Sequence, residues 1–134
     1  MDFYNKLLIN NISVSQAKQL NPLQLAFVGD SVFALFIKTN RVSYINFKVN
    51  DLTKQTKEYV NAKAQANFFF QIKDILTEDE LWVAMRARNT NMHSKAKNYS
   101  IEEYRYATAL EAVIGFLYVT NQIERLNSVL SLIK

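Results

Sequence analysis

The chain has very few of the residues that interrupt helices. Its 134 residues include two glycines and one proline, and there is almost no strict alternation of apolar and polar residues, which is the pattern of a half-buried strand. Glycine and proline are the usual residues of turns and irregular connections. The sequence therefore predicts an all-α fold whose helices are joined by short connections.

Capping signals predict where two of these helices start. Thr77 with Glu80, and Ser100 with Glu103, each have the side chains of a capping box in front of an apolar run. In such a box each side chain bonds a backbone N–H that the first helical turn leaves unpaired. Further helices are expected after Asn21-Pro22, after Asp51 as far as Leu76 and around Ile123 to Ile133, with the polar stretch 89–100 as a loop.

The composition excludes several kinds of site. There is no cysteine and only one histidine, His93, so disulfides, thiolate metal sites and histidine-rich zinc sites are ruled out. With 49% apolar residues the chain can bury a core, and no linker or repeat divides it, so we expect a single domain over residues 1–134. No run of about 18 uncharged apolar residues and no targeting signal is present. We therefore expect a cytoplasmic protein with no membrane span.

Positive charge is concentrated in one part of the sequence. The chain has a formal charge of +4 and a pI near 9.3, and from Leu81 to Ile101 there is no acidic residue. The cations of that stretch are Arg86, Arg88, Lys95 and Lys97. Such a local cationic surface either binds an anion or is a solvated face without a ligand, and the charge alone leaves both possibilities open.

Two acidic residues stand in unusually apolar surroundings. Asp30 is the only charge between Lys18 and Lys38, and Glu111 is the only charge between Arg105 and Glu124. A carboxylate withdrawn from water must be paired, hydrogen-bonded, protonated or bound to a metal. Each acid alone could form a buried salt bridge or lie at the edge of the core. Two oxygen ligands on separate helices, completed by water and phosphate, would suit Mg²⁺.

Two motifs around these acids resemble the ribonuclease III family. The string LAFVGDSVF resembles the family's signature, and TALEAVIGFLY resembles its second acidic motif. The segment RARN, the pair Lys97-Asn98 and the segment YRYAT look like the Mini-ribonuclease III branch of the family. The resemblance covers roughly Leu20 to Leu130 and implies the helical bundle of a ribonuclease III catalytic domain. No separate double-stranded-RNA-binding domain is expected.

The resemblance assigns roles to individual residues. Asp30 matches the signature aspartate and Glu111 the glutamate of the second motif, which in the family hold Mg²⁺ and act in catalysis. Ala26 and Thr108 stand where ribonuclease III generally has two more acids, and their helical spacing from Asp30 and Glu111 keeps them facing the site. Mini-ribonuclease III is similar in lacking these outer carboxylates. We therefore expect a metal held by fewer direct ligands.

The resemblance also implies a function and a quaternary structure. It implies a Mg²⁺-dependent endoribonuclease that cuts double-stranded RNA as a homodimer, leaving 5′-phosphate and 3′-hydroxyl ends, with the 23S ribosomal RNA precursor as substrate. Arg86, Arg88, Lys95 and Lys97 would be exposed and bind RNA phosphates. Phe27 matches an aromatic residue that packs across the family's dimer interface, although a core phenylalanine is equally expected. The alternatives are a non-catalytic module that binds structured RNA and a basic module that binds a protein.

Overall fold

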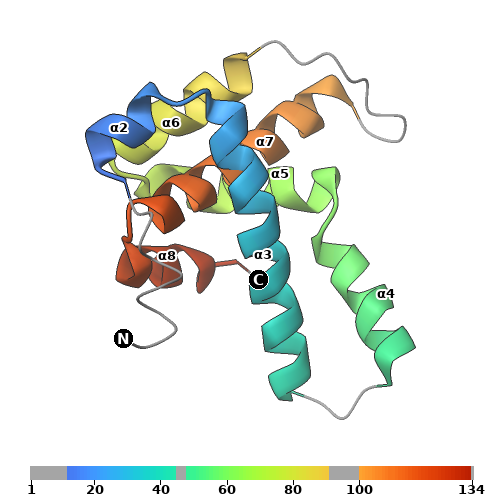
Figure 1. The fold of residues 1–134 in the computed structure, drawn as a ribbon. Coiled ribbons are helices and arrows are strands. Elements are labelled where there is room, and N and C mark those ends of the chain that lie inside the picture. The colour runs from blue at the N-terminus through green and yellow to red at the C-terminus, as the bar shows by residue number, and fades with distance from the viewer. Residues whose placement is uncertain (1–11, 45–47, 91–99, 134) are drawn as a thin grey trace, which may run out of the picture.

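The computed structural model describes residues 12–44, 48–90 and 100–133. Every regular element in these ranges is a helix, which confirms the predicted all-α fold (Figure 1). In chain order the elements are α2 (Val14–Gln19), α3 (Pro22–Tyr44), α4 (Val49–Tyr59), α5 (Ala62–Ile72), the 3-10 helix η1 (Lys73–Ile75), α6 (Glu78–Asn89), α7 (Ile101–Val119) and α8 (Ile123–Leu130).

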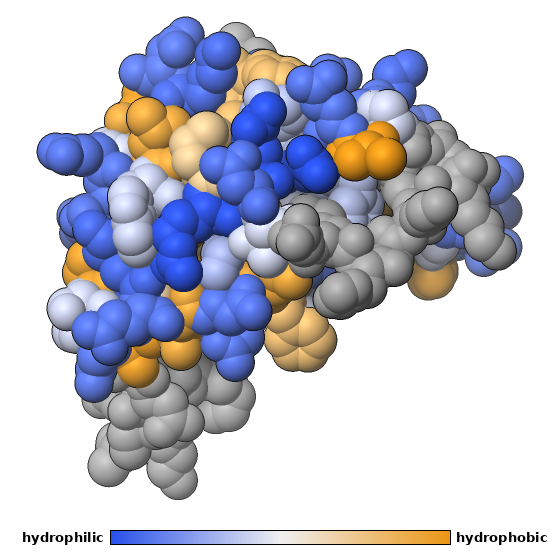
Figure 2. Space-filling view, turned by 90° about the horizontal axis from the view of Figure 1, so that it is seen from above, coloured by the Kyte–Doolittle hydropathy of each residue, from blue (hydrophilic) through white to orange (hydrophobic). Residues whose placement is uncertain are grey.

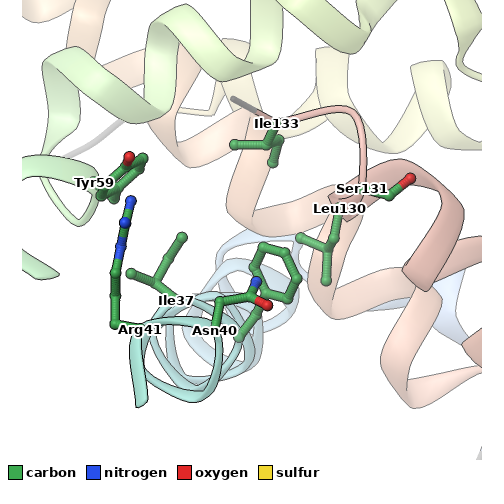
Figure 3. Close-up of a pocket in the computed structure, with 8 residues that line it drawn as sticks. Ile37, Asn40, Arg41, Tyr59, Leu130, Ser131 and Ile133 are labelled. Carbon is green, nitrogen blue, oxygen red and sulfur yellow. The ribbon is translucent and has the colours of Figure 1, made fainter. Parts of the chain in front are cut away.

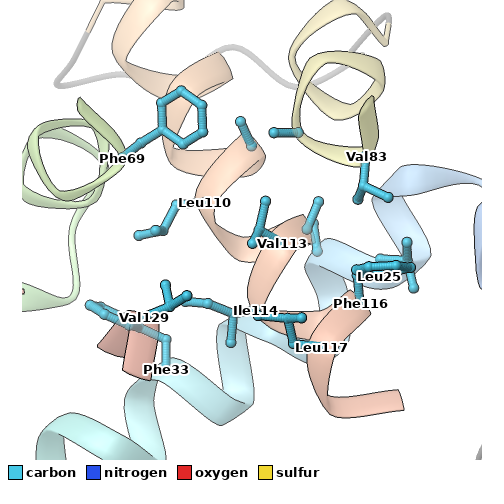
Figure 4. Close-up of a cluster of buried hydrophobic side chains, with 14 of the residues drawn as sticks. Leu25, Phe33, Phe69, Val83, Leu110, Val113, Ile114, Phe116, Leu117 and Val129 are labelled. Atoms are coloured by element: carbon cyan, nitrogen blue, oxygen red, sulfur yellow. The ribbon is translucent and has the colours of Figure 1, made fainter. Parts of the chain in front are cut away.

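Helix α7 is the centre of the hydrophobic core. Ten of its residues between Ala107 and Leu117 are buried, so apolar side chains point to every side of the helix. Its largest contacts are with α3, α5 and α6. Figure 4 shows side chains from these neighbours, among them Phe33, Phe69 and Val83, surrounding Leu110 and Val113 of α7. A charged residue on such a helix is conspicuous, and Glu111 is the one that interrupts this run.

Helix α3 packs one face against α7 and exposes the other. Phe33 is fully buried, whereas Phe27 is 80% and Leu35 66% exposed. By length and apolar composition alone, the stretch from Pro22 to Val42 could cross a membrane. One such helix is weak evidence for a membrane span, because the core helix of a bundle has the same composition.

The capping boxes lie where the sequence predicted them. The Thr77 and Ser100 hydroxyls accept hydrogen bonds from the backbone N–H groups of Glu80 and Glu103, at 3.2 and 3.1 Å. The Glu80 and Glu103 carboxylates in turn accept hydrogen bonds of 3.0 Å from the backbone N–H groups of Thr77 and Ser100. Helix α6 therefore starts at Glu78 and α7 at Ile101.

The helix predicted after Asp51 as far as Leu76 is two helices, so that prediction was wrong in its interior. Helix α4 ends at Tyr59 and α5 begins at Ala62. The Asn61 side chain accepts from the Ala64 N–H at 2.9 Å and donates to the Lys57 carbonyl at 2.8 Å. Asparagine favours such local bonds over a continuing helix, so Asn61 caps α5 and closes the end of α4.

The last helix and the exposed surface complete the bundle. Helix α8 ends at Leu130, three residues earlier than expected, and Arg125 anchors it to α6 through paired hydrogen bonds of 2.9 Å to the buried Glu80 carboxylate. On the face seen from above, hydrophilic residues predominate and hydrophobic ones form separate patches (Figure 2). Scattered surface apolar residues of this kind are normal and need no partner.

Candidate active site

The two glycines lie where helices α3 and α7 cross in direct backbone contact. A β-carbon added at Gly29 would overlap the backbone carbonyl of Glu111 and lie 2.9 Å from the backbone nitrogen of Gly115. A β-carbon added at Gly115 would overlap the carbonyl of Leu25 and lie 3.0 Å from the nitrogen of Gly29. Only residues without side chains allow this approach, which explains why two glycines stay in helices despite their low helix propensity.

The crossing places the two predicted metal-binding acids side by side. Asp30 follows Gly29 on α3, and the Glu111 backbone touches Gly29. The Glu111 carboxyl is hydrogen-bonded to Asp30, and its pKa is raised to about 9, first by burial and then by the bond to Asp30 and its charge. Glu111 is half-buried, but Asp30 is exposed, so the expectation that both are withdrawn from water holds only for Glu111.

This pair of oxygens suits a divalent cation. Neither carboxyl forms an ion pair with a cation in the part of the chain that the structure describes, so the expected alternative of a buried salt bridge does not occur there. Two facing carboxyls share a proton when nothing else neutralises them. A cation bound by both oxygens would offset the burial of Glu111 and the negative charge of Asp30, which both raise the pKa of Glu111.

The site has few direct ligands. Within the described ranges, no group of three or more aspartate, glutamate, histidine or cysteine side chains could hold a metal. Ala26 and Thr108, which replace the outer acids of the family, are buried at 7% and 6% exposure. The Thr108 hydroxyl donates to the Tyr104 carbonyl at 2.8 Å. Water or substrate oxygens would have to complete the coordination of Mg²⁺, which usually keeps several waters.

Arg86, expected to be an exposed RNA-binding residue, is half-buried and engaged with the protein. Its guanidinium donates to the Lys18 carbonyl at 2.6 Å, at the end of α2. The same group lies 4.7 Å from the ring centroid of Trp82, and the Lys18 ammonium lies 4.5 Å from it. Arg86 therefore links α2 to α6, a structural role that the charge pattern did not reveal.

Of the three other predicted RNA-binding residues, the structure describes Arg88. Arg88 is also half-buried, with its guanidinium 5.0 Å from the Tyr106 ring centroid and donating to the Asn89 side chain at 2.8 Å. Its Nε is buried and has no hydrogen-bond partner among the described residues. Lys95 and Lys97, with most of the predicted loop, lie outside the described residues.

Phe27 is a surface residue and not a core phenylalanine. It is 80% exposed, the largest value among the exposed large hydrophobic residues. Leu35 and Val42 lie eight and fifteen residues further along α3 and are 66% and 65% exposed. Helical geometry places all three on the side of α3 that faces away from α7, and we call them the α3 stripe.

Comparison with known proteins identifies the family. The ribonuclease III domain model matches residues 23–122. The chain is 45% identical to a Mini-ribonuclease 3 of Clostridium tetani over 87% of this chain and 78% of that protein. It is 39% identical to the Mini-ribonuclease 3 of Staphylococcus aureus over 92% and 93% of the two chains. A crystal structure of a protein from Fusobacterium nucleatum superposes with a TM-score of 0.79 at 31% identity, over 84% of this chain and 92% of that one. The chain belongs to the ribonuclease III family.

Family membership confirms the resemblance found in the motifs, including the Mini-ribonuclease III branch. The chain is an endoribonuclease of the ribonuclease III family, which acts on double-stranded RNA. The non-catalytic alternatives are therefore not retained. The matched residues 23–122 contain both Asp30 and Glu111, so the crossing of α3 and α7 lies inside the family domain.

Proposed function

We propose that this ribonuclease III family member cuts double-stranded RNA with Mg²⁺ held by Asp30 and Glu111. The observation that carries the proposal is the contact between these two carboxyls, which come from different helices and have no cationic partner among the described residues. A structural role would favour pairing with an arginine, as Glu80 pairs with Arg125 at 2.9 Å in the same bundle.

The two acids have different tasks in this proposal. Mg²⁺ supplies Lewis-acid activation of the scissile phosphate and lowers the pKa of a water molecule. Glu111, half-buried and fixed by the glycine crossing, sets the position of the site. Asp30 is exposed, so its carboxylate is accessible to metal and solvent. The pKa of Glu111 is raised to about 9, so its carboxyl would have to release a proton on becoming a metal ligand.

We also propose that two copies form a homodimer through the α3 stripe. Beside the stripe, a groove of about 430 Å³ separates α3 from α4, and its apolar lining includes Ala34, Val42, Val49 and Leu52. The exposed Phe27 ring of a second copy is a suitable occupant of this groove, because a two-fold interface pairs one surface patch with the same patch of the partner. Two sites in one dimer would cut both strands of a duplex.

The substrate proposal extends the family assignment. Arg88, Lys95 and Lys97 would contact phosphates of an A-form duplex, which proteins recognise mainly through its shape and backbone. Arg86 would stabilise the fold more than it would contact RNA, because its guanidinium already donates a hydrogen bond to the Lys18 carbonyl. As the motif resemblance implies, the proposed substrate is the 23S ribosomal RNA precursor, cut in the cytoplasm.

A cleavage assay with matched variants tests the catalytic proposal. Asp30→Asn and Glu111→Gln remove charge at nearly constant shape, so each should lower the cleavage rate of a long RNA duplex in Mg²⁺ at least a hundredfold. Glu102→Gln removes an exposed acid from the same helix as Glu111 and should cut normally. EDTA should stop the wild-type reaction. Wild-type rates in either site variant, with circular dichroism showing a folded protein, would rule out the two-carboxylate site.

A further inference from the structure

A second concave site lies at the far end of α3 from Asp30. Arg41 of α3, Tyr59 at the end of α4, and Leu130, Ser131 and Ile133 at the end of α8 converge around a cavity of about 440 Å³ (Figure 3). This volume lies within the usual range of small-molecule sites, roughly 300–1,000 Å³. Eleven residues separate Asp30 from Arg41, which is about 16 Å along a helix axis, so the cavity is separate from the catalytic pair.

The cavity has one cationic wall. Arg41 rises from α3 toward Tyr59, and its guanidinium carbon lies 4.4 Å from the ring centroid of Tyr59 (Figure 3). The Tyr59 ring also stacks on Phe68, with centroids 5.9 Å apart and planes 18° from parallel. The contact with this packed tyrosine restricts the motion of the guanidinium. A preoriented guanidinium favours a ligand because less side-chain entropy is lost on binding.

Among the described residues, no acidic side chain pairs with Arg41. None of the residues that line the cavity is acidic, and no ion pair joins Arg41 to a carboxylate in the ranges that the structure describes. By contrast, Arg125 and Lys18 on the same molecule both have carboxylate partners, at 2.9 and 2.8 Å. An arginine in a cavity without an acid favours an anion, since its planar fork matches phosphate and carboxylate oxygens.

The rest of the lining combines apolar side chains with the polar groups of Asn40, Tyr59 and Ser131. Phe36, Ile37, Leu130 and Ile133 contribute hydrocarbon surface. The Ser131 hydroxyl donates to the Ser128 carbonyl at 2.7 Å, so its oxygen remains able to accept a hydrogen bond. A bare inorganic anion would use Arg41 and leave the apolar walls without a partner. A ligand with a ring and an anionic group would use both.

We propose that this cavity binds a small organic phosphate of the size of a nucleoside monophosphate. The phosphate pairs with the Arg41 guanidinium, and the ring system lies against Phe36, Leu130 and Ile133. The inference does not depend on the cleavage mechanism, because none of these residues belongs to the catalytic pair.

Calorimetric titration in EDTA tests the proposal, since removal of divalent metal suppresses phosphate binding at Asp30 and Glu111. The probes are AMP, adenosine and inorganic phosphate. AMP should bind with one site per chain, at least tenfold more tightly than either fragment, because only AMP engages both Arg41 and the apolar walls.

Two variants and one matched control locate the binding. Arg41→Gln should weaken AMP binding about tenfold or more, the effect of losing a charged hydrogen-bond donor. Lys38→Gln removes an exposed charge one turn earlier on α3, outside the cavity, and should leave the affinity unchanged. Ser131→Glu places an acid on the exposed rim and should abolish binding even if Arg41→Gln does not fold.

Several results would overturn the proposal. They are AMP affinity no better than that of phosphate, wild-type affinity in a folded Arg41→Gln or Ser131→Glu protein, and an equal loss in Lys38→Gln. The last result would mean that AMP responds only to the overall positive charge.

Discussion

Glu111 combines burial with an acidic neighbour, and this has a consequence for stability. Its pKa is raised to about 9 in the folded, metal-free protein, whereas in the unfolded chain the carboxyl has its ordinary pKa of 4.5. Between these two values the unfolded chain releases the proton and the folded protein keeps it. The folded state is therefore progressively disfavoured as the pH rises from about 4.5 to about 9.

Urea unfolding in EDTA at several pH values measures this effect. The free energy of unfolding of the wild type should fall from pH 5 to pH 9 relative to Glu111→Gln, which has no proton to release at this position. Adding Mg²⁺ should reduce the difference at high pH if the metal binds the ionised pair. Parallel pH profiles for the two proteins in EDTA would show that Glu111 is ionised in the folded state at neutral pH.

Arg86 gives a second test at the scale of one residue. Its 2.6 Å hydrogen bond to the Lys18 carbonyl and its contact with Trp82 join α2 to α6. Arg86→Ala should lower the free energy of unfolding by about 1–2 kcal/mol, because a partly buried charged hydrogen bond is lost. Thermal unfolding would measure the change. The exposed Lys63→Ala should stay within about 0.5 kcal/mol of wild type, and an equal effect in both variants would argue against the linking role.

Among the elements, the contact between α3 and α7 determines the geometry of the site. Gly115→Ala adds a methyl group that would overlap the Leu25 carbonyl and so must push the helices apart. We expect a loss of about 1–3 kcal/mol in unfolding free energy, as for overpacked cores, together with slower cleavage because Asp30 and Glu111 separate. Alanine otherwise stabilises a helix relative to glycine by about 1 kcal/mol, so the direction of the change is diagnostic.

A matched variant on the surface of α3 controls for helix propensity. Ser31→Ala lies next to Asp30 but on an exposed position, and should be neutral or slightly stabilising. It should also keep the cleavage rate. If Gly115→Ala were as stable and as active as Ser31→Ala, the close contact would not control the site.

The elements also show which features a sequence can predict. Helix starts at Glu78 and Ile101 were predictable because their capping boxes act over three residues. The break at Asn61 was not, since apolar residues recur at helical spacing on both sides of it. Only the Asn61 bonds to Lys57 and Ala64 reveal that the side chain competes with the helix there.

The candidate site likewise has features that the sequence predicts and features that only the structure reveals. Asp30 and Glu111 could be selected from their apolar surroundings, and the family motifs gave them a role. Their contact could not be derived from spacing, because it depends on how α3 and α7 cross at two glycines. The partners of Arg86 were equally hidden, since Lys18 and Leu20 lie more than 60 residues away in the chain. Charge patterns predict which residues are cationic but not whether the protein itself uses the charge.

At the scale of the whole molecule, the α3 stripe is the surface that the proposed homodimer would bury. A single core phenylalanine typically stabilises a protein by about 1.5–3 kcal/mol on burial, and Phe27 is 80% exposed in one chain. Two copies related by a two-fold axis would bury two such rings and the adjoining Leu35 and Val42 side chains, which are 66% and 65% exposed in one chain.

Phe27→Asp should therefore convert the protein to a monomer without unfolding it. The new charge would lie in water in one chain but would be buried between two, where an unpaired carboxylate costs several kcal/mol. Sedimentation velocity at micromolar concentration would measure the size, and native gels would separate nicked duplexes from fully cut ones. We expect a folded monomer that cuts only one strand of the duplex at each site.

Ile101→Asp is the matched control. It changes an apolar residue of α7 that is 66% exposed, and the protein should remain a dimer and make paired cuts. A monomeric wild type, or paired cuts by a monomeric Phe27→Asp protein, would contradict a dimer formed through this stripe.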